Sequence, residues 1–348
     1  MFLTIIIAFV GLIGLIVSHE FGHFIIAKRF GVKVEEFGIG YPPRLFGRKF
    51  GETVYSLNLL PFGAFVKLPG EIEKTDDPRS FSRQSILKRA LIVAGGVISF
   101  WIISIIIFGV VSGLGSLRAV GDEEIIPGAK VQVAAVSNNS PAKTAGLLPG
   151  DAILNFKRVK EMQEFTDLNK GKEIILTVER GKEILEVSLT PRVSPPQGEG
   201  PMGVALVRTA VKSYPWYEAP WQGISQTVGL TWAIIHGYFE AIANLFKGEP
   251  TGVSLTGPVG VFSLLSQASQ MGIVYFLNFL GLISLYLAVF NLLPIPAVDG
   301  GKLMFLGIEA IRKKAVSEKI EQRLTTAFFL ALILLMIWVT IGDVRKLF

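Results

Sequence analysis

Cysteine is absent from this chain of 348 residues, and histidine occurs only three times. Without cysteine the chain forms no disulfide and offers no thiolate to a metal ion. Charge is also sparse, because 18% of the residues are Asp, Glu, Lys or Arg, whereas 50% are hydrophobic. Several uncharged runs reach the roughly 20 residues that a helix needs to cross a bilayer. The composition therefore favours a membrane protein over a water-soluble one.

The N-terminal sequence also differs from that of a secretory signal peptide. The N-terminus has neither the basic start nor the small-residue cleavage site of such a peptide, so we expect residues 1–27 to stay as a first membrane span. The net charge of +6 does not predict a nucleic-acid partner. The basic residues cluster beside apolar runs, and no RNA- or DNA-binding motif accompanies them.

Four apolar segments predict transmembrane helices. They lie within residues 1–27, 91–114, 274–293 and 324–342. Twelve Lys or Arg residues lie between positions 28 and 89, and six lie between 299 and 323. Basic loops stay on the cytoplasmic side of a membrane, so both segments are expected there. Both chain ends and the region 115–273 are then expected on the outer side.

The segment 217–247 is apolar enough to complicate this topology. A single extra span there would move the six basic residues of 299–323 to the outer side. We therefore expect a helix that lies on the outer leaflet or dips into it. An extra pair of spans, which also uses residues 251–270, preserves the orientation and is the alternative.

Two of the three histidines flank a glutamate in the first span, in the sequence HEFGH at residues 19–23. Residues four apart on a helix face the same direction, so His19 and His23 can hold one metal ion while Glu20 acts on a bound water. A charge inside a bilayer helix costs roughly 2.5–3.5 kcal/mol without a partner. The pattern therefore predicts a metal site rather than a chance match.

A catalytic zinc ion usually has three protein ligands and one open position. The candidates for the third are His236 and Asp299. His236 falls in the outer segment, where we expect an interfacial histidine. Asp299 follows Pro294 and Pro296, which break a helix, near the cytoplasmic end of the third span. Its depth matches that of the histidine pair, and we expect Asp299 to be the ligand.

These motifs together resemble the site-2 protease family of intramembrane zinc metalloproteases. HEFGH is similar to the HExxH of the family, and NLLPIPAVDGG at 291–301 is similar to its NxxPxxxLDG, with Val298 in place of Leu. The segments 58–67 and 256–261 extend the likeness to the family's membrane-associated β-segment and SGPxGI stretch. The resemblance implies one Zn²⁺ per chain, with ligands His19, His23 and Asp299 and with Glu20 as the general base.

The resemblance also implies a substrate site. Asn291 is expected to help to hold the substrate, and Pro294 lies in the same motif. In the β-segment, Gly63, Phe65 and Val66 are candidates to bind an unwound substrate as an added strand. A purely structural hairpin is the alternative for this segment.

Residues 140–154, SPAKTAGLLPGDAIL, resemble the marker segment of a PDZ domain. Runs such as 131–136 and 174–178 predict short strands around it. The likeness points to the regulator-of-sigma-E protease branch, although only one PDZ domain is found here. Its groove could bind a peptide or a C-terminal tail, or exclude bulky substrates.

The expected fold is a polytopic α-helical membrane protein with a cytoplasmic membrane-associated β-segment and an inserted extracytoplasmic PDZ-like α+β domain. The expected order is span 1 (1–27), a loop with the β-segment (28–90), span 2 (91–114), the PDZ-like domain (115–197), an outer-leaflet or linker region (198–273), span 3 (274–301), a loop (302–323) and span 4 (324–342).

The sequence thus predicts a membrane zinc metalloendopeptidase of a bacterial inner (plasma) membrane, with its active site near the cytoplasmic face. Its expected partners are transmembrane protein or peptide substrates and the lipid bilayer. The expected activity is regulated intramembrane proteolysis, such as cleavage of an anti-sigma factor or a remnant signal peptide. The alternatives are an inactive scaffold that binds partner tails through its PDZ domain, and a metal transporter.

Overall fold

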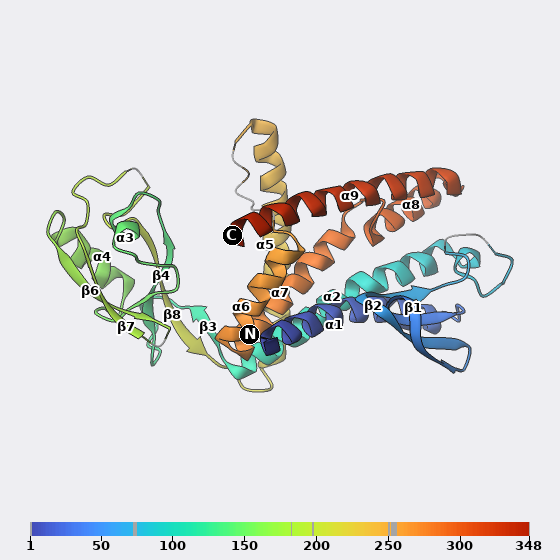
Figure 1. Ribbon diagram of the computed structural model, residues 1–348, viewed down its shortest axis with the longest axis horizontal. Helices are drawn as coiled ribbons and strands as arrows, with labels where there is room; N and C mark the ends of the chain where they lie inside the picture. The colour runs from blue at the N-terminus through green and yellow to red at the C-terminus, as the bar shows by residue number, and fades with distance from the viewer. Residues whose placement is uncertain are drawn as a thin grey trace. The chain divides into compact units, whose positions relative to one another are not determined.

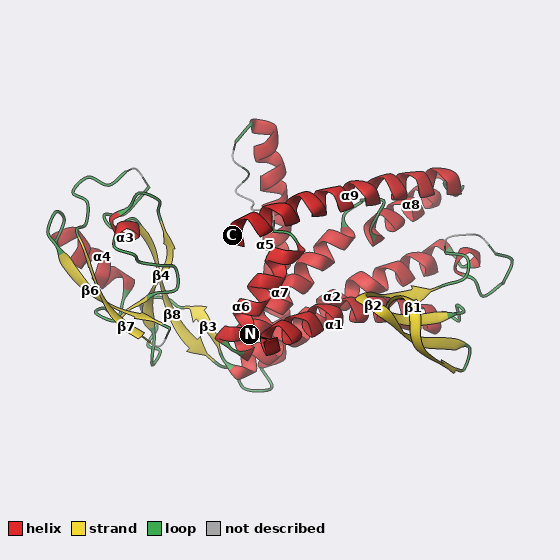
Figure 2. Cartoon of the chain, in the orientation of Figure 1, coloured by secondary structure: helices red, strands yellow, loops and turns green. Residues whose placement is uncertain are grey.

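The computed structural model describes residues 2–71, 75–181, 183–196, 198–249, 251 and 256–347 (Figure 1). The chain divides into two compact units. The first combines Met1–Gly113 with Pro215–Phe348, and the second is Leu114–Tyr214. Figure 2 shows that the first unit is mostly helical with one small sheet, and that the second is built on a larger sheet.

Within the described residues, four helices are long and apolar enough to cross a membrane, as the sequence predicts. They are α1 (Phe2–Arg29), α2 (Ile86–Leu114), α7 (Ile273–Leu292) and α9 (Glu318–Leu347). Their composition explains them, because long runs of Ile, Leu, Val and Phe are interrupted by few charged residues. α9 begins six residues before the span that the sequence predicts.

Small and hydroxylated residues bring α2 and α7 together. The hydroxyl of Ser104 donates to the Gly281 carbonyl at 3.2 Å, and the hydroxyl of Ser284 donates to the Phe100 carbonyl at 2.8 Å. Both serines are fully buried. Hydrogen bonds of this kind between helices hold spans together where the hydrophobic effect contributes little.

A β-hairpin follows α1, formed by β1 (Glu36–Phe50) and β2 (Thr53–Lys67). The first part of β1 pairs twice, so that Phe37 lies opposite both Tyr55 and Val66. The second part of β1, residues 44–50, pairs with the first part of β2, residues 53–58. Residues 64–67 therefore form an edge strand, since β1 covers only one of their sides within this sheet. The sheet is larger than the segment 58–67 on which the sequence prediction rests.

The end of α7 is broken, as the prolines predict. Residues 293–298 form turns, and α8 (Asp299–Arg312) then begins. The expected loop at 302–323 is thus largely helical. The buried Gly301 and Phe305 of α8 are four residues apart, which is helical spacing, and the buried Leu306 lies next to them. Only the short connection between α8 and α9 remains a loop.

The predicted outer-leaflet segment contains a helix, α5 (Ala219–Lys247), that is not among the four candidate spans. It packs on α2, where the Trp101 indole donates to the Thr231 hydroxyl at 3.1 Å. Its Ile234 joins a core cluster with Leu285 of α7. Its place on the outer leaflet stays a prediction.

The helix α6 (Pro258–Met271) packs against α1, α7 and α9. The buried Asp343 carboxylate of α9 accepts a hydrogen bond of 2.9 Å from the Gly260 N–H at the start of α6. Near the other end of α9, the Thr325 hydroxyl donates to the Pro296 carbonyl at 3.0 Å. Two polar contacts therefore fix the two ends of an otherwise exposed helix.

The second unit is one mixed α+β fold. Its six-stranded sheet has the order β3-β8-β4-β5-β6-β7, and its described neighbouring strands are antiparallel. The elements are β3 (Ser116–Ala119), β4 (Lys130–Val136), α3 (Pro141–Thr144), β5 (Ala152–Ile153), α4 (Val159–Leu168), β6 (Ile174–Arg180), β7 (Glu183–Leu189) and β8 (Val204–Lys212). The strands predicted at 131–136 and 174–178 are confirmed by β4 and β6.

The end of this unit differs from the expected domain boundary. The boundary at residue 197 lies outside the described residues, and the unit continues to Tyr214. β8 lies in the middle of the sheet between β3 and β4. The sequence does not reveal this long-range pairing, because β8 follows a stretch rich in Pro and Gly that is typical of a linker.

A buried ion pair stabilises the turn before β5. Asp151 is 1% exposed, and its two carboxylate oxygens accept hydrogen bonds of 2.8 and 2.7 Å from the Arg180 guanidinium. The Leu148 N–H donates to the same carboxylate. Burial raises the pKa of Asp151, but the hydrogen bonds from Arg180 and Leu148 outweigh it and hold the pKa below its ordinary value.

A folded-state pKa below the unfolded value stabilises the fold above the unfolded pKa, and this contribution is lost as the pH falls through the folded value. We expect Asp151→Asn to destabilise the second unit by about 2 kcal/mol at neutral pH. The loss should shrink below about pH 4, where the unfolded aspartate is protonated. Hydrogen exchange of the β5 and β6 amides in the full chain measures the loss of stability and its dependence on pH. A loss that is independent of pH contradicts the stabilising role of the Asp151 carboxylate.

Candidate metal centre

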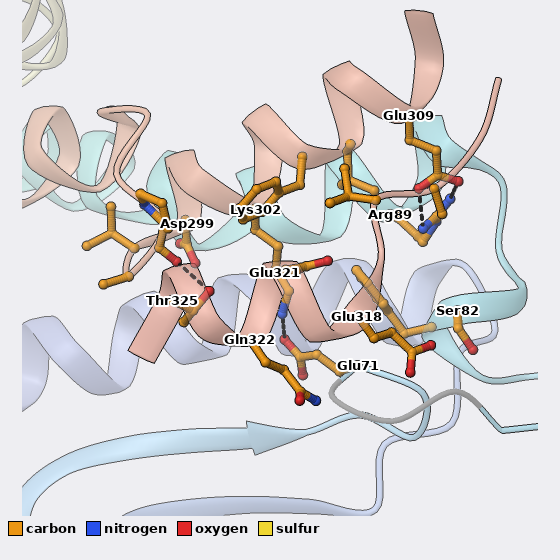
Figure 3. A pocket seen from close by; sticks show the side chains of 18 of the residues that line it. Glu71, Ser82, Arg89, Asp299, Lys302, Glu309, Glu318, Glu321, Gln322 and Thr325 are labelled. Atoms are coloured by element: carbon orange, nitrogen blue, oxygen red, sulfur yellow. Dashed lines mark hydrogen bonds and ion pairs between the residues drawn. The ribbon is translucent and has the colours of Figure 1, made fainter. Parts of the chain in front are cut away.

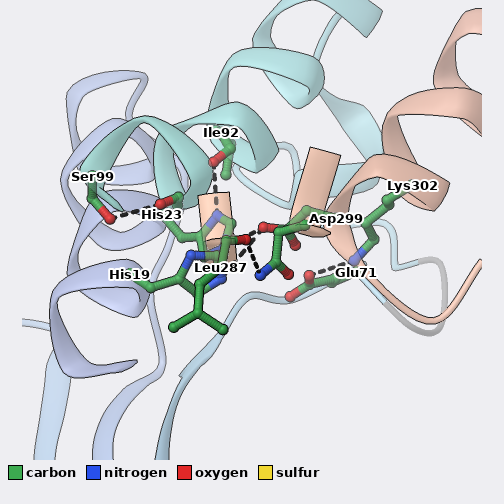
Figure 4. A network of polar contacts seen from close by, with 10 residues as sticks. His19, His23, Glu71, Ile92, Ser99, Leu287, Asp299 and Lys302 are labelled. Atoms are coloured by element: carbon green, nitrogen blue, oxygen red, sulfur yellow. Dashed lines mark hydrogen bonds and ion pairs between the residues drawn. The ribbon is translucent and has the colours of Figure 1, made fainter. Parts of the chain in front are cut away.

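His19 and His23 lie one turn apart on α1 and point in the same direction (Figure 4). Their Nε2 atoms are 3.2 Å apart. The Nδ1 atom of His23 lies 2.9 Å from the Ile92 carbonyl of α2, so this nitrogen carries the proton and donates it. The lone pair of the neutral ring is then on Nε2, which faces His19. A backbone partner of this kind fixes the tautomer and orientation of a metal-binding histidine.

Glycines let α1 and α2 approach closely at the histidines. A Cβ on Gly22 would lie 2.2 Å from the Gly95 carbonyl oxygen. A Cβ on Gly96 would lie 2.2 Å from His23 Nε2 and 2.7 Å from His19 Cε1. The His19 ring also stacks on Phe100 of α2, with a centroid distance of 4.7 Å. α2 thus forms one wall of the site, and only glycine fits at position 96.

Asp299 reaches the histidines from the first residue of α8. Its Oδ2 atom lies 3.3 Å from His19 Nε2 and 3.3 Å from His23 Nε2. The tight turn before it depends on Gly300 and Gly301, where an added Cβ would lie 2.2 Å from the Leu293 and Ile295 carbonyl oxygens respectively. The break after α7 therefore folds back and directs the carboxylate into the site.

The three donor atoms suit a zinc ion. Ligands at about 2.0–2.1 Å in a tetrahedron are about 3.3 Å apart, which matches the three distances between these atoms. Asp299 Oδ2 is buried and makes no hydrogen bond within the described residues. His19, His23 and Asp299 are also the only described group of three such side chains whose ligand atoms converge in this way. Two nitrogens and one carboxylate oxygen leave a fourth position for water.

Glu20 lies beside this group, on the next position of α1. Its carboxylate is within hydrogen-bonding range of the Val66 backbone, in the edge strand of the hairpin. Aromatic contacts hold the hairpin against α1, since the centroid of the Phe24 ring lies 5.4 Å from that of Phe37 and 6.0 Å from that of Tyr55. An acid–base group and an open strand edge are therefore neighbours.

The remaining candidate residues divide between the hairpin and the end of α7. Gly63 has a φ of +140°, and a Cβ there would lie 2.5 Å from the Tyr41 ring. Phe65 stacks on Tyr41 with a centroid distance of 6.4 Å. The side-chain amide of Asn291 donates to the Leu287 carbonyl at 2.9 Å, and Pro294 is exposed in the following turn.

A polar cavity of about 510 Å³ adjoins Asp299 (Figure 3). Asn291 and Asp299 line it, together with Lys302 and acidic residues of the start of α9. Figure 3 shows Glu321 and Gln322 directed toward the same space. Charged and polar side chains thus surround a space next to the third donor.

The third histidine does not take part in this site. His236 is 61% exposed on α5 and lies 3.6 Å from Glu240 one turn along. The sequence reasoning missed the supporting residues, namely Ile92, Gly96 and Phe100 of α2. The pair Gly95-Gly96 inside an apolar span was the available signal, because small residues permit close contact of membrane helices.

Comparisons with known proteins indicate the family of the chain. Residues 7–336 match the family model described as peptidase family M50. A Clostridium perfringens protein named "Putative zinc metalloprotease" is 35% identical, over 98% of both chains. The regulator of sigma-W protease RasP of Bacillus subtilis is 28% identical over the whole of both chains. The zinc metalloprotease RasP of Oceanobacillus iheyensis is 27% identical, over 99% of this chain and the whole of its own.

Gly96→Ala tests the wall of the site. The added methyl group would overlap His23 Nε2, so we expect zinc affinity to fall about 10- to 100-fold. Gly14→Ala on α1 is the matched control, because nothing lies within 4 Å of its Cβ. Competition with a fluorescent chelator measures the affinity; equal affinities in the two variants contradict the proposed geometry.

Asp299→Ala tests the third donor. With only two imidazoles left, we expect the zinc content of the purified protein to drop from one per chain to a small fraction. Glu240→Ala, an exposed acid on α5, should keep the full content. Elemental analysis gives the stoichiometry, and an unchanged content in Asp299→Ala removes this residue from the site.

Proposed function

The chain belongs to peptidase family M50 and is a zinc metalloprotease, and on that premise we propose that it cleaves peptide bonds within or near transmembrane segments of membrane proteins. One observation carries the proposal. His19, His23 and Asp299 converge on one point beside Glu20, and an open strand edge lies next to that carboxylate. A protease needs both a water-activating centre and a place to hold an extended peptide.

The proposed location is a bacterial inner membrane, with the centre near the cytoplasmic face. His19 lies nine residues before Lys28, at the basic end of α1. Residues 28–89, which include the hairpin, hold twelve Lys or Arg, and residues 299–323, which include the α8–α9 connection, hold six, which favours the cytoplasmic side for both. The second unit and α5 are then on the outer side.

Zinc held by the proposed ligands His19, His23 and Asp299 supplies a more acidic water and polarises the carbonyl of the scissile bond. Glu20 is the proposed general base that accepts the proton of the attacking water. The same carboxylate then returns the proton to the leaving amine nitrogen. The site lies among apolar helices, where bulk water is scarce and the polar cavity at Asp299 is the route for supply.

Substrate binding requires local unwinding, since the carbonyls of a helix are hydrogen-bonded and shielded. We assign the edge strand 64–67 as the surface that pairs with the unwound segment, with Gly63, Phe65 and Val66 along it. Asn291 lines the cavity and would hold the substrate from the opposite side through its side-chain amide, beside Pro294. The substrate backbone would thus lie between the hairpin and the α7–α8 turn.

The second unit contains residues 140–154, the segment on which the PDZ-like prediction rests, and α3 and β5 lie within it. It would bind a peptide or C-terminal tail, or restrict access of large substrates. The name of the Bacillus subtilis relative describes a regulator of sigma-W. We propose regulated intramembrane proteolysis for this chain too, with an anti-sigma factor or a remnant signal peptide as the substrate class.

An inactive scaffold and a metal transporter are less well supported. A scaffold has no need of three converging donors with an acid beside them. A transporter would need polar groups along several spans, whereas α2 carries no charged residue beyond its first turns. The donor set therefore favours hydrolysis.

Glu20→Gln tests the mechanism. The amide keeps the shape of the side chain but accepts no proton, so we expect cleavage of a transmembrane substrate to fall at least about 100-fold. Zinc content should stay at one per chain. Reconstitution with a fluorescent transmembrane peptide in liposomes gives the rate, and near-normal cleavage by the variant would refute the proposed role of Glu20.

A further inference from the structure

An ion pair lies between the hairpin and α8, close to the metal centre. The Nζ atom of Lys302 is 2.5 Å from Glu71 Oε1, and each side chain is 28% exposed. Figure 4 shows the pair beside Asp299, and Figure 3 shows it at the polar cavity. The lysine ammonium also lies 5.5 Å from the centre of the Phe81 ring. Two different partners therefore fix the position of this ammonium.

Glu71 belongs to the turn that directly follows the edge strand. Its N–H donates to the Leu68 carbonyl at 3.3 Å, and Leu68 is buried against α1 and α2. The Phe81 N–H donates to the Pro69 carbonyl at 2.8 Å, which ties the turn to the short 3₁₀ helix η1 (Phe81–Arg83). A short, packed connection thus links Glu71 to Val66, the strand residue that faces Glu20.

Lys302 lies on the first turn of α8, three residues after Asp299. Residues with this spacing are on one face of a helix. Glu71, Asp299 and Lys302 also line the same cavity beside the centre. Lys302 therefore lies on the helix that begins with the proposed ligand Asp299. Glu71 lies in the segment that follows the edge strand beside Glu20.

We propose that the Glu71–Lys302 ion pair is a positioning device that sets the place of edge strand 64–67 relative to the metal centre. This inference rests on the proposed function, in which the strand holds the substrate. A shift of about 1 Å between substrate and catalytic groups can cost about 100-fold in rate. Neither residue touches the reacting atoms. A partly exposed pair also contributes little to the stability of the fold, so positioning and folding can be separated.

The test compares Glu71→Gln, Lys302→Met and the double variant. Each single variant should lower kcat about 10- to 100-fold for a transmembrane peptide, with KM changed less than about threefold and zinc content unchanged. Because both act through one contact, the double variant should be no slower than the slower single variant. Lys302→Arg keeps the charge and should retain most of the activity.

Glu309→Gln is the matched control. The Arg89–Glu309 pair joins α2 to the same helix α8 with contacts of 3.1 and 2.5 Å, but it does not reach the hairpin. Its kcat should stay within about threefold of the wild-type value, because Glu309 lies ten residues beyond Asp299 on α8 and pairs with α2 rather than with the hairpin. The proposal is overturned by unchanged kcat in Glu71→Gln, by multiplied losses in the double variant, by lost zinc or lost fold in the single variants, or by an equal loss in Glu309→Gln. Failure of the wild-type protein itself to cleave the peptide contradicts the proposed function instead.

Discussion

The direct contact between the backbones of α1 and α2 is the constraint on which the site depends. Gly22 and Gly95 allow the helices to touch, and Gly96 leaves room for the imidazole of His23. At this spacing the Ile92 carbonyl is within reach of His23 Nδ1 and fixes the ring. A larger side chain at the contact would separate the helices, and the histidines would then lack both their wall and their hydrogen-bond partner. These three glycines therefore determine where the two imidazoles lie.

A second consequence follows for Asp299. Because α1 and α2 hold the histidines rigidly, the carboxylate has to be brought to them by the chain that follows α7. Two prolines end the helix, and Gly300 and Gly301 permit the turn to pack against its own carbonyl groups. The centre thus combines a rigid pair of donors with one donor delivered by a turn. Polar groups enter the membrane region only where such turns or close contacts give them partners.

Much of this arrangement can be predicted from the sequence, because its signals are local. Long apolar runs predict the four candidate spans, and the spacing of His19 and His23 predicts a shared direction. Pro294 and Pro296 predict the break before Asp299. The features that sequence reasoning missed come from distant pairings. The central place of β8 in its sheet, the double pairing of β1 and the contact of Glu71 with Lys302 join residues that no local pattern connects. The helix α8 was missed because its motif reads as a turn, although its later residues have helical spacing.

The two end contacts of α9 have a mechanical consequence. Thr325 and Asp343 are separated by 18 helical residues, about 27 Å at 1.5 Å per residue. Between these two residues the helix is mostly exposed, and a polar contact holds it near each end. One attachment is Gly260 at the start of α6, and the other is the Pro296 carbonyl, three residues before Asp299. The helix α9 therefore connects the start of α6 to the turn that delivers the carboxylate, so the centre is tied to a helix that contributes none of its three donors.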